Sequence, residues 1–223
     1  MIRAIFYKEW IKIGWYWLLA LIASTGFAGF AMLRLGRACS LKGAAHIWQV
    51  MIERDAIFID LLQYVPLIIG LGLAVVQFVP ELQRKSFKLT LHLPIRATTA
   101  VGTMLLFGAT MLIVSFIPAI VIMYCYLQSF LAPELWQHVL FTSAPWYAAG
   151  LAAYFLTAWI ALEPTWARRV INGVIALLII KVYFQQAKPE AYNGFMPLLS
   201  IVTLLLSMLS MISLTRFRDG RQD

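Results

Sequence analysis

The sequence has little charge and very little cysteine for its length. Only 13% of its 223 residues are charged, whereas 62% are hydrophobic, and the mean hydropathy is +0.81. A soluble domain of this size is about a quarter charged and cannot bury so much apolar surface in one aqueous core. The two cysteines argue against a disulfide framework, because Cys125 lies inside an apolar run. The composition therefore predicts a membrane protein.

Acidic residues are scarcer than basic ones. The chain has 10 Asp and Glu against 18 Lys and Arg, a formal net charge of +8. In a soluble protein this excess would suggest a nucleic-acid partner, but no basic module with interleaved aromatic residues is present. In a membrane protein, basic residues hold loops on the cytoplasmic side and contact anionic lipid. We therefore predict contacts with membrane lipids and none with nucleic acid.

The sequence also lacks the motifs of an enzyme. No lysine follows a glycine, so the phosphate-binding loop that ends in Gly-Lys-Ser/Thr is missing. The histidines at 46, 92 and 138 lie in predicted connections, away from any Ser–His–Asp set or paired carboxylates. His46 with Glu53 and Asp55 fits no metal-ligand spacing. We predict no catalytic residues, no metal site and no cofactor in this chain.

What the sequence does contain is six long apolar runs. A helix needs about 20 apolar residues to cross a bilayer. The fifth run is short and contains Lys181 near its outer end, from where a lysine can snorkel to the headgroups. The predicted fold is a single all-α integral membrane domain, residues 1–223, with six transmembrane helices. The predicted spans are 13–33, 61–79, 101–127, 139–162, 170–184 and 195–214.

The distribution of basic residues predicts the orientation in the membrane. Six spans place both termini on one side. Twelve of the 18 Lys and Arg residues lie in the termini and the even-numbered connections, against five in the odd-numbered ones. By the positive-inside rule, both termini and the connection at 80–94 are then cytoplasmic. We expect the chain to be a multi-pass protein of the cytoplasmic (inner) membrane. Residues 1–12 sort Lys8, Glu9 and Lys12 to one side of a helix, which predicts an interfacial helix; a frayed start of the first span is the alternative.

The second connection, "ELQRKSFKLTLHLP", concentrates charge between two apolar runs. On a helix, Glu81, Lys85 and Lys88 share one face beside an apolar stripe, and Pro80 stands at the helix start. Residues 87–93, "FKLTLHL", also alternate as a strand does. We predict a helix through Lys88 and leave both structures open for 87–93. A bounded amphipathic helix at the inner surface either rests on lipid or binds a cytoplasmic partner.

Six spans, cytoplasmic termini, a "FYKEW" helix and the segment "PELQRKSFKLTLHLPIRA" together resemble the ABC-2-type permeases of ABC transporters. The likeness covers nearly the whole chain in topology. Its most specific local feature is the acidic residue followed by basic residues and "LP". In that family this segment is a coupling helix seated in a cleft of a separate ATPase subunit. The resemblance implies a permease subunit that couples ATP binding and hydrolysis by that partner to export, beside a second permease copy or homologue.

The resemblance also assigns residues to the ATPase contact. They come from the coupling segment at 80–94, the connecting helix at 1–12 and a lesser contact in the loop "EPTWARR". The set is Glu81, Arg84, Lys85, Lys88, Lys8, Glu9, Glu163, Arg168 and Arg169. The sequence does not indicate the cargo or whether the permease is a homodimer. The alternative function is a non-transporting membrane scaffold or sensory subunit that recruits a cytoplasmic partner through the same segment.

Overall fold

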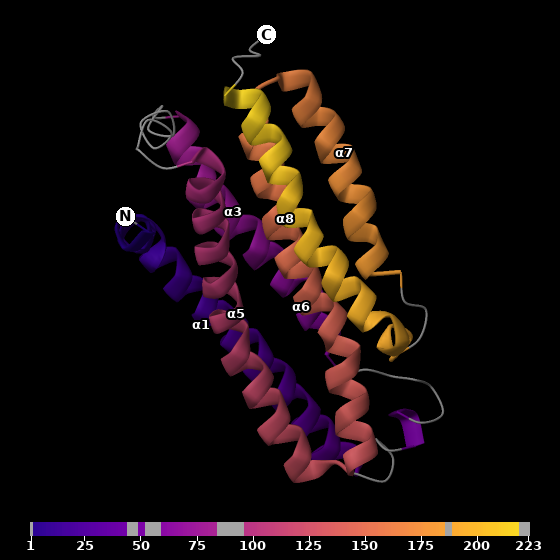
Figure 1. Cartoon of the computed structure of the whole chain (residues 1–223). Helices are drawn as coiled ribbons and strands as arrows, with labels where there is room; N and C mark the ends of the chain where they lie inside the picture. The colour runs from indigo at the N-terminus through magenta and orange to yellow at the C-terminus, as the bar shows by residue number, and fades with distance from the viewer. Residues whose placement is uncertain (1, 44–48, 52–58, 84–95, 186–188, 219–223) are drawn as a thin grey trace.

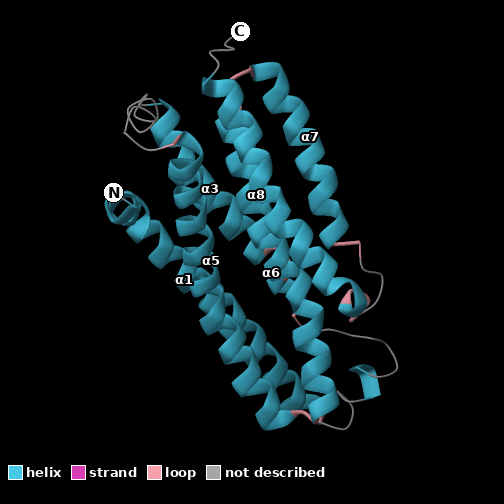
Figure 2. Ribbon diagram, in the orientation of Figure 1, coloured by secondary structure: helices cyan, strands magenta, loops and turns pink. Residues whose placement is uncertain are grey.

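The fold is a bundle of long helices. A computed structural model describes residues 2–43, 49–51, 59–83, 96–185 and 189–218, and within these ranges there are helices and turns but no strands (Figure 2). Two short 3₁₀ helices, η1 (Asp60–Leu62) and η2 (Asn193–Phe195), precede α3 and α8. The long helices are α1 (Ile2–Lys42), α3 (Val65–Gln83), α5 (Ala97–Phe130), α6 (Pro133–Leu162), α7 (Trp166–Tyr183) and α8 (Met196–Arg218) (Figure 1). The predicted all-α class is confirmed.

Helix α6 lies at the centre of the bundle. It packs against α3, α5, α7 and α8, while α1 packs against α5 and α3. Its sequence begins with Pro133 in the first helical turn and ends before Pro164, which holds Glu163 in an extended conformation. Small residues over 148–153 let neighbouring helices approach closely. Most residues of α6 are therefore buried among the other helices.

Helices α3 and α6 approach each other closely at a pair of glycines. A Cβ atom added to Gly70 would lie 1.9 Å from the carbonyl oxygen of Gly150, and one added to Gly150 would lie 2.6 Å from that of Pro66. Both values are far below any contact that real Cβ atoms make. The backbones of α3 and α6 therefore touch directly, and only glycine fits at these two positions.

Among the residues that the structure describes, five helical stretches are long and apolar enough to cross a bilayer. Their outward faces carry large apolar side chains, such as Leu204 on α8, 65% exposed. Such a surface is stable in lipid and not in water. The chain is therefore a multi-pass membrane protein. The five stretches are Arg3–Leu41, Asp60–Gln83, Ala97–Ser129, Pro133–Leu162 and Asn193–Phe217.

The predicted fifth span corresponds to α7, which is not among these five. Its 18 residues include Arg168, Arg169 and Lys181, which lower its apolar character. It nevertheless runs along much of α6. It starts directly after the α6–α7 turn, and the loop that follows it returns to the first half of α6, where the backbone N–H of Glu190 donates to Thr142 Oγ1 over 3.2 Å. The sixth crossing stays a prediction.

Helix α1 differs from the expected interfacial helix followed by a span. It continues without a break for 41 residues, about 61 Å, which is twice the thickness of the hydrocarbon core. In its first turns Ile5, Glu9 and Ile13 are buried, whereas Trp10 is exposed. The side that carries Glu9 thus faces the protein, the reverse of a helix that rests its apolar face on lipid. The reason is that Glu9 finds polar partners on other helices.

Pro80 is not a helix start, contrary to the prediction. It lies inside α3, which ends at Gln83. A proline in a helix removes one backbone hydrogen bond, but here only the last turn follows it, so little of the helix is disturbed. The remainder of the predicted coupling segment, with Arg84, Lys85 and Lys88, lies outside the described residues, as do both structures considered for 87–93.

Candidate functional site

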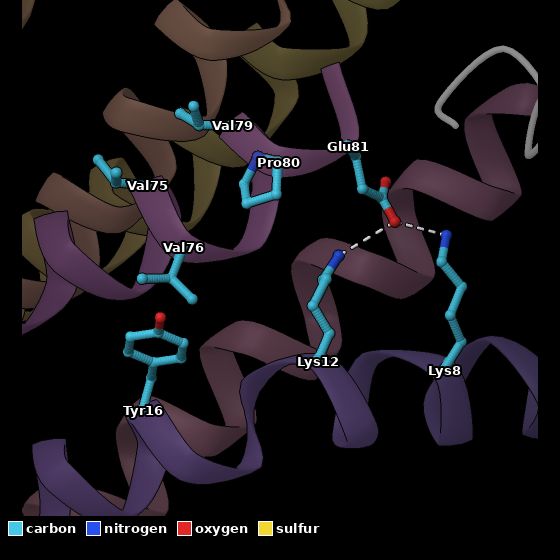
Figure 3. Close-up of a pocket in the computed structure, with 8 residues that line it drawn as sticks. All are labelled: Lys8, Lys12, Tyr16, Val75, Val76, Val79, Pro80 and Glu81. Atoms are coloured by element: carbon cyan, nitrogen blue, oxygen red, sulfur yellow. Dashed lines mark hydrogen bonds and ion pairs between the residues drawn. The ribbon is translucent and has the colours of Figure 1, made fainter. Parts of the chain in front are cut away.

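A cluster of buried charges joins the first turns of α1 to the last turn of α3. Lys12 Nζ lies 2.9 Å from the Glu9 carboxylate and 3.1 Å from Glu81 Oε1. Lys8 Nζ lies 2.5 Å from the same Glu81 oxygen and 3.9 Å from Glu9 Oε1 (Figure 3). Two ammonium groups therefore balance two carboxylates, and the ion pairs fasten α1 to α3 at one end of the bundle.

The two acids of this cluster are buried, and the two lysines reach the surface. Glu9 is 0% exposed and Glu81 3% exposed. The side chains of Lys8 and Lys12 are 40% and 19% exposed. An unpaired carboxylate at such depth would be very unfavourable, so both acids require their lysine partners in the folded state. The ammonium groups, by contrast, also face outward.

The cluster extends into the core through Gln77 of α3. Gln77 Nε2 donates to Glu9 Oε2 and to the carbonyl oxygen of Met104 in α5, each over 2.9 Å. Tyr154 Oη of α6 donates to Gln77 Oε1 over 2.7 Å. Both Gln77 and Tyr154 are fully buried. A single polar path therefore connects four helices. We call it the α1/α3 network: Lys8, Glu9, Lys12, Gln77, Glu81 and Tyr154.

A glycine in α5 makes room for this path. A Cβ atom on Gly108 would lie 2.1 Å from Tyr154 Oη and 2.5 Å from Gln77 Oε1. Any side chain there would displace one or both groups. The hydrogen bond between Tyr154 and Gln77 therefore depends on the absence of a side chain at position 108.

We expect Tyr154→Phe to destabilise the protein by roughly 1–3 kcal/mol, because Gln77 Oε1 loses a buried donor. The matched control is Tyr147→Phe on the same helix. The Tyr147 hydroxyl is buried and makes no hydrogen bond to any described residue, so its removal should cost nothing. Thermal unfolding of the two purified variants in detergent measures the difference. Equal loss of stability in both would contradict the assigned role of the Tyr154–Gln77 bond.

A second buried acid, Glu163, joins the α6–α7 turn to the end of α8. Ser213 Oγ donates to Glu163 Oε2 over 2.5 Å, and Arg216 Nη1 lies 3.5 Å from the same oxygen. Arg169 Nε donates to the backbone carbonyl of Glu163 over 2.6 Å. Glu163 itself is 0% exposed. We call this group the α6/α8 network: Glu163, Arg169, Ser213 and Arg216.

Replacing Glu163 by alanine should release the last turns of α8. The change removes the hydrogen bond to Ser213 and the ion pair to Arg216, and each contact to a charged group contributes roughly 1.5–3 kcal/mol. We expect hydrogen exchange in peptides covering 206–218 to accelerate at least about tenfold, because local opening becomes easier. Glu134→Ala, which removes an exposed acid at the start of α6, is the control. Unchanged exchange in Glu163→Ala would show that the network does not hold α8.

The structure brings together most of the described residues predicted for a partner contact. Lys8, Glu9 and Glu81 meet in one network, and Glu163 with Arg169 in the other. The three acids are buried and bound to groups of this same chain. Arg168 is half-exposed and belongs to neither network. No described group of three His, Cys, Asp or Glu residues is placed to hold a metal ion.

Sequence reasoning did not single out Gln77, Tyr154, Ser213 and Arg216. A signal for Gln77 was present, because an amide deep in an apolar run is costly unless it has a partner. The other three carry no such signal. Tyrosine and serine are common in apolar helices, and Arg216 follows the last apolar run where a cytoplasmic arginine is expected.

Comparison of the chain with known protein families, with curated proteins and with solved structures finds no match in any of the three. Over the described residues the chain is an all-helical, multi-pass membrane protein, with two networks of charged and polar groups that each join the ends of its helices.

Proposed function

We propose that this chain is the membrane-spanning permease subunit of an ATP-driven ABC transporter, an exporter in the cytoplasmic membrane. Separate ATPase subunits would bind ATP and Mg²⁺, and a second permease copy or homologue would complete the pathway. The observation that carries the proposal is the α1/α3 network. It ties the start of α1 to Glu81, the first residue of the charged segment where a coupling element is expected.

The network can transmit a displacement of that segment to two helices. Residues 84–88 follow α3 directly, so a push on them acts on α3 through the backbone. Glu81 passes the same displacement to α1 through Lys8 and Lys12. The pairs resist separation because moving α3 away from α1 would leave the buried Glu81 carboxylate without a counter-ion. Motion of a partner is thereby delivered to α1 and α3 as one unit.

The α6/α8 network serves the same purpose on the other side of the bundle. The end of α3, the α6–α7 turn and the end of α8 all lie toward the upper end in Figure 1. In this proposal the cations Arg84, Lys85, Lys88 and Arg168 contact the ATPase. Glu9, Glu81 and Glu163 act within this chain, where they position the helices that move.

The proposed topology has six crossings with both termini in the cytoplasm. Two features support it. The twelve-to-five excess of basic residues favours that side for the termini. Helix α7, 18 residues or about 27 Å long, is close to the roughly 30 Å of the hydrocarbon core, and its end meets the first half of α6 through Glu190.

The test is to reconstitute the chain with a candidate ATPase, one that is encoded by a neighbouring gene or that purifies together with the chain. Arg84→Ala/Lys85→Ala should weaken assembly at least about tenfold and abolish the effect of the permease on ATP hydrolysis. The matched control is Arg34→Ala/Arg37→Ala, which removes two exposed arginines near the opposite end of α1.

Intact assembly and intact ATP-driven transport in Arg84→Ala/Lys85→Ala would contradict the proposal. Assembly that depends on these residues, without any change in ATP hydrolysis or any transport, would identify the alternative, a membrane scaffold. Because both substitutions leave the buried acids untouched, a folding defect is not expected to obscure the result.

A further inference from the structure

An open groove runs between α1 and α3, beginning at the charged cluster. Its first part has a volume of about 440 Å³. Figure 3 shows the lysines and Glu81 at one end and Tyr16 pointing from α1 toward Val76 of α3. The lining residues are Lys8, Lys12, Tyr16, Val75, Val76, Val79, Pro80 and Glu81.

The groove continues along α1 as an apolar channel. Tyr16 and Val76 also line a second hollow of about 240 Å³, which ends near Ala23 and Ile69. Ala23 in turn borders a third hollow of about 390 Å³ that reaches Phe30. Fifteen residues separate Lys8 from Ala23, about 22 Å of helix. Apart from its charged end, this surface is lined by aliphatic, aromatic and glycine residues.

The charged end presents cations outward. The carboxylates of Glu9 and Glu81 are buried behind the ammonium groups of Lys8 and Lys12, whose side chains are 40% and 19% exposed. An approaching molecule therefore meets ammonium donors first. Those donors favour an anionic oxygen ligand such as a phosphate. The complementary ligand is an amphiphile with an anionic head and a long apolar tail.

We propose that this groove binds a membrane phospholipid, with its phosphate against Lys8 and Lys12 and one acyl chain along the channel between α1 and α3. Both helices are long and apolar enough to cross the bilayer, so the channel opens where acyl chains are present. The more exposed Lys8 engages the headgroup, while Lys12 keeps its contacts to both acids. This lipid site does not depend on the proposed transport function.

A lipid fits this groove better than a second copy of the chain does. The charged end of the groove and its apolar walls match the two halves of one phospholipid. A second copy would have to present an anionic group and an apolar ridge that are spaced as the charged end and the apolar walls of the groove are. Among the described residues, the acids of α1 and α3 that could supply such a group, Glu9 and Glu81, are themselves buried in the α1/α3 network.

Photolabelling in vesicles tests the proposal. The full chain is reconstituted in phosphatidylcholine containing a small fraction of phosphatidylglycerol with a photoreactive acyl chain, and labelled peptides are mapped. We expect preferential labelling of α1 and α3 along the groove. Gly72→Leu should reduce it about tenfold, the effect of displacing roughly two buried methylenes. A Cβ on Gly72 meets nothing within 4 Å, so the substitution fills the groove without disturbing the fold.

Two controls separate this site from general exposure to lipid. Gly173→Leu fills an equally open position on α7 and should leave the labelling unchanged. Lys8→Gln should lower labelling by the phospholipid about fivefold, the worth of one basic residue near an anionic headgroup. The same variant should not affect labelling by diacylglycerol, which carries the same photoreactive chain without a phosphate.

Equal labelling of all lipid-facing helices, or no effect of Gly72→Leu, would overturn the proposal. A second contradictory result would be cross-linking of two chains through a cysteine introduced at position 72, without any lipid label. That result would place a second copy of the chain in the groove. If Lys8→Gln lowered labelling by diacylglycerol as much as labelling by the phospholipid, Lys8 would not bind the phosphate, and that assignment would be overturned.

Discussion

Replacing Lys12 by methionine is expected to cost about 3–5 kcal/mol of folding free energy, the usual result of removing one partner from a buried ion pair. Methionine fills a similar volume but cannot donate to the two carboxylates. Glu9 would then retain only Gln77 and the more distant Lys8 as polar partners. Thermal or denaturant unfolding of the purified variant in detergent measures the loss.

The informative control removes the stranded charge as well. In the double variant Glu9→Gln/Lys12→Met, the amide at position 9 can still accept from Gln77 and needs no counter-ion. We expect the double variant to be more stable than Lys12→Met alone, because the penalty comes from an unpaired buried carboxylate. Equal stability of the two, or a loss below about 1 kcal/mol in Lys12→Met, would show that Glu9 is not held by charge pairing.

Gly70→Ala adds one methyl group to the chain, and among the described glycines we expect this addition to be the most damaging. Its Cβ would lie 1.9 Å from the Gly150 carbonyl oxygen, and a backbone atom cannot move aside as a flexible side chain can. Overpacking a core typically costs about 1–3 kcal/mol, and a clash between two helix backbones should reach or exceed the upper end. We expect a matching fall in the unfolding temperature and in the yield of monodisperse protein.

Gly72→Ala is the matched control, two residues further along the same helix. Its Cβ would meet nothing within 4 Å. Alanine has the higher helix propensity, so this variant should be as stable as the original chain or slightly more stable. Similar behaviour of the two variants would contradict the direct backbone contact between α3 and α6.

The helices were largely predictable because their signals are local. An apolar run marked each long helix that the structure describes, although the run over α7 was short. Where local signals misled, a distant partner was the cause. Glu9 looked like a surface residue on the helical projection, but its partner Gln77 lies 68 residues away in the sequence. Periodicity alone cannot reveal such a partner.

Pro80 shows a second kind of limit. Proline is favoured in the first turn of a helix and disfavoured further along it, so the sequence predicted a helix start at Pro80. The buried contact of Glu81 with Lys8 and Lys12 holds the chain helical beyond Pro80, and nothing near position 80 indicates that contact.

The candidate site combines residues that the sequence singled out with contacts that it did not indicate. The resemblance to ABC-2-type permeases implied that Lys8, Glu9, Glu81, Glu163 and Arg169 contact another protein, and that role stays a prediction. In the structure, the three acids of this set bind groups of this same chain and are only 0–3% exposed. A sequence shows that a charge is unusual in its context. It does not show whether the compensating charge lies on the same chain or on a partner.

Isolating this chain from its native membrane under mild conditions, and identifying what accompanies it, tests whether it is a permease driven by a separate ATPase. We expect a stoichiometric partner that carries a phosphate-binding loop and hydrolyses ATP, and whose binding is lost in Arg84→Ala/Lys85→Ala but kept in Arg34→Ala/Arg37→Ala. Isolation of the chain without any such ATPase, or with one bound equally by both double variants, would contradict it.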